Sequence, residues 1–138
     1  MLITGMKNSL LLVVAIIMAF SFTKINVQDD PWVAPESAKE IENIVPEKKR
    51  AASAKKGEKV FMKRCSFCHG ETAKGDGPAG ARFTPKPANL TSESVQGQTD
   101  GEIFWKVSNG RGNMPKWESI LSEEERWDVV NFIRTVIE

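Results

Sequence analysis

One short stretch of the chain brings together residue types that can hold a metal or a prosthetic group. Cys65, Cys68 and His69 form a C-x-x-C-H motif, which contains both cysteines and the single histidine of the 138-residue sequence. Two thiols at this spacing can add to the two vinyl groups of one haem, and the adjacent imidazole can then bind the iron. The pattern therefore indicates one covalent haem c, with the cysteines as attachment points and His69 as an iron ligand.

Other uses of this motif are weaker. A thioredoxin-like redox pair needs a βαβ context, which the surrounding sequence lacks. Structural zinc needs four cysteine or histidine ligands, and the chain has two cysteines and one histidine. A small structural disulfide is the plainest alternative. Haem attachment is favoured because the rest of the chain supplies the other parts that a haem protein needs.

Length and charge limit the class of protein. The formal net charge of +1 gives no strong attraction to nucleic acid or to an anionic membrane. The length allows one domain of about 100 residues and a separate N-terminal segment. A domain of that size has a thin core, to which a covalent macrocycle would add a large apolar surface.

The N-terminal residues are typical of a targeting segment. Lys7 precedes an unbroken apolar run from Leu10 to Phe20. This run suits the core of a signal peptide and is shorter than the roughly 20 residues that cross a bilayer. We expect residues 1–22 to be a cleaved signal peptide or, alternatively, an uncleaved membrane anchor. In both cases the rest of the chain is exported, and its expected location is the periplasm.

Residues 23–51 are predicted to be a polar lead-in or linker with a short helix. Ser37 and Glu40 have the spacing of a helix capping box. The basic run at 48–50 is typical of a solvated linker, and docking of a partner is the alternative. Trp32 is unusual in a linker, so we expect its indole to pack onto the following domain. An exposed indole near a membrane is the other option.

Two helices are expected to frame residues 52–138. Residues 54–64 carry apolar side chains at helical spacing and lead directly into the cysteines. Residues 122–137 begin with a capping box and carry a wide apolar face. We expect one helix to cross the other closely, with Val129 and Phe132 packed on Gly57 and Phe61.

The segment after the cysteines is rich in glycine and proline. Residues 70–87 are too interrupted for a regular element, and a loop of this length usually lines something functional. We expect a proline carbonyl, from Pro85 or Pro87, to accept the hydrogen bond of the His69 imidazole. Leu90 is a candidate haem contact.

Met114 lies in a second glycine-rich loop, after a helix expected over 100–107. Its thioether could complete the iron as the second axial ligand. Because sulfur is soft, a Met/His pair favours Fe(II) and raises the reduction potential. The alternative is a methionine that fills a gap beneath the loop.

In this order the motifs resemble a bacterial monohaem class I cytochrome c over residues 52–138. The resemblance implies an all-α, class I cytochrome c fold, with crossed N- and C-terminal helices around a covalently attached haem. It implies His69 and Met114 as axial ligands, and Arg111 and Trp117 as partners of the haem propionates. It rests on Gly57, Phe61, the C-x-x-C-H motif, Pro87-Ala88-Asn89-Leu90, the loop from Asn109 to Trp117, and the aromatic C-terminal helix.

The resemblance implies a one-electron carrier and not an enzyme, because two filled axial positions exclude oxygen and small substrates from the iron. Its partners would be redox proteins, whose identity the sequence does not specify. One alternative is a haem subunit tethered to, or part of, a larger membrane-associated redox complex. Another is an enzyme or gas-binding haem protein with an open iron position. Membrane association would follow from an uncleaved N-terminus.

Overall fold

The computed structural model describes residues 32–137, which form one compact unit beginning at Trp32. The predicted targeting segment and the first part of the lead-in lie outside these residues. Within them the regular structure is helical, apart from one isolated β-bridge between Arg111 and Met114. Among these helices none combines the length and apolarity that a membrane crossing requires. The all-α fold predicted from the sequence is confirmed.

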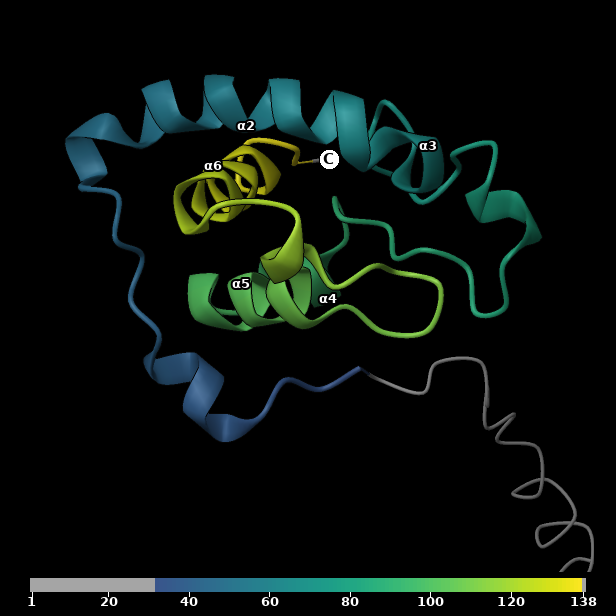
Figure 1. Ribbon diagram of the computed structural model, residues 1–138, viewed down its shortest axis with the longest axis horizontal. Helices are drawn as coiled ribbons and strands as arrows, with labels where there is room; N and C mark the ends of the chain where they lie inside the picture. The colour runs from purple at the N-terminus through teal and green to yellow at the C-terminus, as the bar shows by residue number, and fades with distance from the viewer. Residues whose placement is uncertain (1–31, 138) are drawn as a thin grey trace, which may run out of the picture. The chain divides into compact units, whose positions relative to one another are not determined.

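The helices are arranged around a central C-terminal helix (Figure 1). The first long helix, α2, packs on one side of α6, and α5 packs against α6 from another side. Short 3-10 turns and two single-turn helices connect them. In chain order the elements are η1 (Glu36–Glu40), η2 (Glu47–Lys49), α2 (Arg50–Arg64), α3 (Ser66–His69), η3 (Gly80–Arg82), α4 (Glu93–Gln96), α5 (Asp100–Asn109), η4 (Trp117–Ser119) and α6 (Glu123–Ile133).

Helices α2 and α6 approach each other closely at Gly57. A Cβ atom built on Gly57 would overlap the carbonyl oxygen of Asp128, so the two backbones can meet only where a side chain is missing. Further along the same contact, the rings of Phe61 and Phe132 pack with centroids 5.0 Å apart. The predicted packing of the terminal helices is therefore confirmed.

Local hydrogen bonds explain where α6 begins and ends. Ser122 and Glu125 form the predicted capping box, in which each side chain accepts a hydrogen bond from the other residue's backbone N–H. At the far end the amide of Thr135 donates to Phe132 at 2.8 Å, a tight turn that stops the helix short of the predicted end at 137. Regular α6 therefore ends at Ile133.

The predicted capping box of the lead-in is absent. Residues Glu36–Glu40 form a 3-10 helix that follows Pro35, and its first turn has no side-chain cap. Ser37 lies inside this turn and not before it, so its hydroxyl is not placed to accept from the following amides. The prediction from spacing alone was wrong because proline had already set the start of the turn.

The lead-in from Trp32 onward is docked on α5. Ala38 is fully buried, and a Cβ atom on Gly101 of α5 would overlap its carbonyl oxygen. The Trp32 ring meets the Trp105 ring edge to face, with centroids 6.3 Å apart. The expected packing of Trp32 onto the domain is confirmed.

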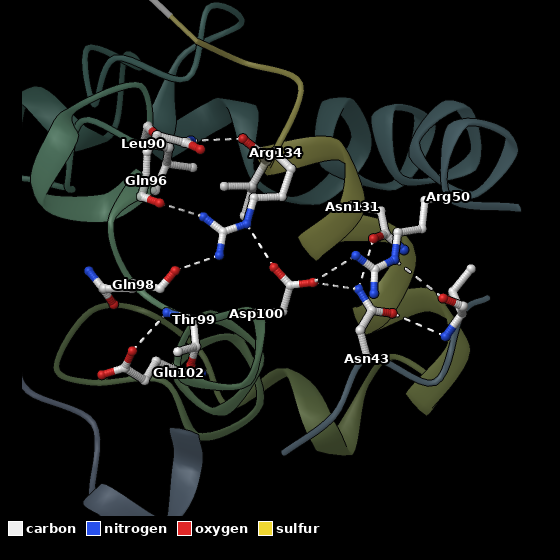
Figure 2. A network of polar contacts seen from close by, with 12 residues as sticks. Asn43, Arg50, Leu90, Gln96, Gln98, Thr99, Asp100, Glu102, Asn131 and Arg134 are labelled. Atoms are coloured by element: carbon white, nitrogen blue, oxygen red, sulfur yellow. Dashed lines mark hydrogen bonds and ion pairs between the residues drawn. The ribbon is translucent and has the colours of Figure 1, made fainter. Parts of the chain in front are cut away.

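A polar network joins the lead-in to α5 and α6 (Figure 2). The Nδ2 of Asn43 donates to Asp100 at 2.8 Å and to Asn131 at 2.9 Å. The Nε of Arg134 donates to the other Asp100 oxygen at 2.8 Å. Burial raises the pKa of Asp100, but the hydrogen bonds from Asn43 and Arg134 and the charges of Arg134 and Arg50 outweigh it, so the pKa lies below its ordinary value of 3.8.

Replacement of Gly57 by alanine should separate the two crossed helices. Because the added methyl group would meet backbone, which cannot rotate away, we expect a loss of at least about 3 kcal/mol in the free energy of unfolding. Chemical denaturation monitored by far-UV circular dichroism measures it. Glu58→Ala, on the exposed neighbour, is the control and should change stability by less than about 0.5 kcal/mol. Equal effects of both variants would contradict the close approach.

Acid titration of stability should reveal the Asp100 network. A carboxyl with a depressed pKa in the folded state stabilises the fold above its ordinary pKa, and this contribution is lost as pH falls through the folded value. We expect Asp100→Asn to cost about 1–3 kcal/mol at neutral pH and progressively less below pH 3.8. Denaturant unfolding across the acid range tests this. A pH-independent cost would refute it, and the exposed Glu71→Gln serves as control.

Candidate haem-binding site

The C-x-x-C-H motif lies at the end of α2, as the sequence predicted. Cys65 follows the last residue of the helix, and Cys68 and His69 belong to the single turn α3. The amide of Cys65 donates to Phe61 at 2.7 Å and the amide of His69 donates to Cys65 at 2.9 Å. The helical hydrogen bonding thus continues through the motif and fixes the backbone of all three residues. Both cysteines are free and half-buried.

The imidazole of His69 has a defined hydrogen-bond partner. Its Nδ1 lies 3.1 Å from the carbonyl oxygen of Ala88. A carbonyl can only accept, so Nδ1 carries the proton and Nε2 keeps its lone pair. Burial lowers the pKa of His69, and the Ala88 bond opposes that shift only in part. The ring is therefore neutral near pH 7 (its ordinary pKa is 6.5), which is the form that binds metals.

The acceptor of this hydrogen bond is Ala88 and not a proline. The carbonyl of Pro87 instead faces Gly75, where a Cβ atom would overlap its oxygen. The oxygen 3.1 Å from His69 Nδ1 belongs to Ala88. The predicted acceptors, Pro85 and Pro87, were therefore wrong, although the segment that supplies the acceptor was the expected one.

The loop after His69 folds back on the motif through backbone hydrogen bonds. A Cβ atom on Gly77 would lie 2.6 Å from the Cys68 carbonyl carbon, so the loop can approach only where it has no side chain. This approach holds the motif between α2 and the loop. The bonds run from Gly75 to His69 at 2.7 Å, from Gly77 to Cys68 at 3.1 Å and from Ala79 to Phe67 at 3.0 Å.

Burial also affects the first thiol. Desolvation, with a smaller effect of Cys68, raises the pKa of Cys65 to about 12. Cys65 is therefore a neutral thiol at physiological pH and not a reactive thiolate. This environment suits a permanently bonded attachment point better than a redox-active cysteine pair.

Met114 lies in a short turn with tightly fixed backbone. The amide of Arg111 donates to Met114 at 3.1 Å, and the amide of Met114 donates back to Arg111 at 3.0 Å. Gly110 and Gly112 both have positive φ, of 61° and 58°, which other residues rarely adopt. The Met114 side chain is half-buried and packs against the main core cluster. This cluster consists of Ile103, Phe104, Val107, Trp117, Leu121, Trp127, Val129, Val130 and Ile133.

Leu90 connects the two ends of the site. It packs against the main core cluster, which Met114 also borders, and against the smaller cluster of Phe61, Ala73 and Phe132, which Cys65 borders. The structure therefore brings Cys65, Leu90 and Met114 to one continuous apolar region.

The remaining predicted site residues lie in different surroundings. Trp117 is buried in the main core cluster, and Pro87 is half-buried in the loop. Arg111 is exposed, and its guanidinium lies 5.5 Å from the centroid of the Trp32 ring. Contact of Arg111 and Trp117 with haem propionates stays a prediction.

Sequence reasoning missed one residue that orients the site, Ala88. No side-chain chemistry identifies it, because it contributes only a backbone carbonyl. The density of glycines in the preceding loop was the available signal, since it indicated close backbone approach without saying to which atoms.

The residues present fit a covalent haem. Two free thiols stand at the required spacing, and a neutral imidazole has one nitrogen occupied and the other available. A thioether on a fixed turn borders the same apolar region. Soft sulfur and imidazole nitrogen are the donors that haem iron takes.

An all-α fold with crossed terminal helices, the first of them ending in C-x-x-C-H, defines a class I c-type cytochrome domain. The chain belongs to the family described as cytochrome c oxidase, cbb3-type, subunit III, whose family model matches residues 52–133. Domains of this class carry covalent haem c and transfer electrons, and they are not enzymes. The cofactor predicted from the motif is thus confirmed for the family.

Two curated relatives illustrate the range of this similarity. The cbb3-type cytochrome c oxidase subunit FixP of Bradyrhizobium diazoefficiens is 36% identical over 75 residues, which are 53% of this chain and 24% of FixP. Cytochrome c6 of Euglena gracilis is 33% identical over 79 residues, which are 57% of this chain and 87% of cytochrome c6. The chain therefore spans about a quarter of the oxidase subunits that it matches.

A solved structure shares the fold. The reducing HAO-like protein complex of Kuenenia stuttgartiensis contains a chain that matches with a TM-score of 0.59 at 21% identity. The match covers 71% of this chain and 50% of that one. At this identity the likeness shows a shared fold. The curated relatives include subunits of cbb3-type oxidases as well as a small cytochrome, which implies redox partners for this class of domain.

Two glycines of the Met114 turn provide a matched test of its geometry. Both have positive φ, but a Cβ atom on Gly110 would overlap the Met114 carbonyl oxygen, whereas one on Gly112 meets nothing within 4 Å. We expect Gly110→Ala to displace Met114 and weaken the far-red charge-transfer band of a thioether-ligated ferric haem. Gly112→Ala should cost about 1–2 kcal/mol of strain and keep the band. Absorption spectra of both oxidised variants check this, and an intact band in Gly110→Ala would contradict it.

Proposed function

We propose that the chain is a one-electron carrier whose haem is bonded to Cys65 and Cys68 and ligated by His69 and Met114. The observation that carries this proposal is the state of His69. It directly follows the thiols, its Nδ1 is bound to Ala88, and its Nε2 is left available. When bound, the haem supplies an Fe(II)/Fe(III) couple.

The chain's own residues would keep the two ligands in place in both oxidation states. Ala88 orients the imidazole, and the paired hydrogen bonds between Arg111 and Met114 fix the backbone of the thioether ligand. Fixed ligands favour electron transfer because little has to move when the charge changes. With His69 and Met114 both bound to it, the iron would have no position left for water or a small substrate.

We further propose that electrons enter and leave near Phe67. This side chain lies between the two cysteines of the motif and is 66% exposed. Aromatic side chains, phenylalanine among them, are enriched in protein–protein interfaces. The rest of the haem would be surrounded by Pro87, Leu90, Arg111 and Trp117. The last two would contact the haem propionates.

The wider organisation is also a proposal. We infer that residues 52–138 are the cytochrome domain, that residues 1–22 are a signal peptide or an anchor, and that residues 23–51 lead into the domain. Export to the periplasm follows from the apolar N-terminal run and from the place where C-x-x-C-H motifs receive haem. The donor and acceptor would be redox proteins that dock on this domain.

A second candidate function is that of a tethered subunit in a larger redox complex. The observation that favours it is the similarity to cbb3-type oxidase subunits, of which this chain matches about a quarter. N-terminal sequencing of the exported protein, together with its distribution between membrane and soluble fractions, separates the two. A retained N-terminus with the protein in membranes would favour the subunit.

Replacement of Met114 by alanine tests the axial ligand. Because thioether sulfur favours Fe(II), its loss should lower the reduction potential while the haem stays attached through the cysteines. The far-red band of the oxidised protein should disappear, and the reduced protein should bind carbon monoxide readily. Absorption spectroscopy, redox titration and carbon monoxide binding measure these effects.

The matched control is Met62→Ala, because Met62 lies on α2 just before the motif and is 44% exposed. It should leave the spectrum, the potential and the weak reactivity with carbon monoxide unchanged. If wild-type protein lacks the band and binds carbon monoxide freely, the carrier proposal fails in favour of an open-site haem protein.

A further inference from the structure

The lead-in brings an aromatic ring to the turn that carries Met114. The Trp32 ring stands edge to face on Trp105, at an angle of 62°. The guanidinium of Arg111 lies 5.5 Å from the centroid of the Trp32 ring, and Lys106 Nζ lies 5.8 Å from it. The face of an indole is electron-rich and attracts cations at these distances. The Trp32 ring thus attracts two cations whose like charges repel each other.

Arg111 is the direct structural partner of Met114. Each residue donates its amide to the carbonyl of the other, at 3.1 and 3.0 Å, and together they form the isolated β-bridge. A force on the Arg111 side chain therefore reaches the backbone of Met114 through one residue. Trp32 is therefore connected to the proposed iron ligand through two contacts. Its ring contacts the Arg111 guanidinium, and the Arg111 backbone is hydrogen-bonded to Met114.

The lead-in is itself held firmly, so Trp32 has a fixed base. Ala38 is fully buried against α5 at Gly101, where only a glycine leaves room for its carbonyl. Asn43 donates hydrogen bonds to Asp100 on α5 and to Asn131 on α6 (Figure 2). These contacts keep residues 38–43 on the domain without help from Trp32.

We propose that Trp32 is a positioning residue for Met114, which acts through Arg111 to hold the turn in the conformation that binds iron. The inference rests on the proposed function, because it assumes that Met114 is the axial ligand. It gives the lead-in a role in the redox site, which neither the C-x-x-C-H motif nor the family match at residues 52–133 includes.

Competition with imidazole measures how firmly Met114 is held. In the full-length oxidised holoprotein at neutral pH, added imidazole replaces the methionine, and the dissociation constant reports the cost of removing it. We expect Trp32→Ala to bind imidazole about 3- to 30-fold more tightly than wild type. This range corresponds to the free energy of one cation–π contact, which the substitution removes. The reduction potential should also fall. Trp32→Phe keeps an aromatic face and should restore most of the wild-type affinity.

Two further variants separate positioning from loss of stability. Asn43→Ala removes two hydrogen bonds of the lead-in but keeps the Ala38 contact with Gly101 and every contact with Arg111, so it should lower the unfolding midpoint and leave the imidazole affinity within about twofold of wild type. In an Arg111→Ala background, Trp32→Ala should add no further change in imidazole affinity, because the side chain through which Trp32 acts on Met114 is already absent. If Trp32→Ala does not fold, Trp32→Leu keeps the apolar volume without the π face and should show the same tighter binding.

The outcomes distinguish this inference from the function on which it rests. If wild type has the far-red band, and Trp32→Ala or Trp32→Leu leaves the imidazole affinity and the potential unchanged, the positioning role is overturned and the carrier function stands. Additive effects in the Arg111→Ala background would overturn it in the same way. If wild type has no band, the proposed ligation fails and this inference fails with it.

Discussion

The structure depends on the approach of two backbones at Gly57. Where α2 passes Asp128 of α6 there is no space for a side chain, and this contact sets where the two helices cross, with the Phe61–Phe132 packing further along the same pair. Because α2 leads directly into Cys65, the same contact decides where the cysteines and His69 lie. A metal-binding motif is thus positioned by a steric constraint that lies two turns before it in the chain.

The second half of the site is positioned by turns and not by helices. Ala88 and Met114 both lie in irregular segments, and each is held by backbone hydrogen bonds or close backbone contacts at glycines. The helices thus supply a rigid frame, while the loops supply the acceptor for the histidine and the thioether. Binding residues on loops held by a rigid scaffold are a common arrangement.

The sequence predicted what local patterns encode. Helix periodicity and the Ser122–Glu125 box placed α6, and the C-x-x-C-H motif and the loop around Met114 placed the candidate ligands. It could not predict that Ala88 would be the acceptor, because that depends on the path of a long loop and not on a side chain. The spacing of Ser37 and Glu40 misled for a related reason, since a proline two positions earlier had changed where the turn starts.

The docked lead-in has a consequence for the way this chain folds. Asn43 donates to Asn131 across 88 positions of sequence, so the lead-in can complete its packing only once the C-terminal helix is in place. Contacts between residues far apart in the sequence form slowly, because the chain loses the entropy of closing a long loop before the contact contributes any stabilisation. A prosthetic group fixed midway along the chain would offer an early nucleus on which both halves could condense. Maturation and folding are then expected to be kinetically coupled events.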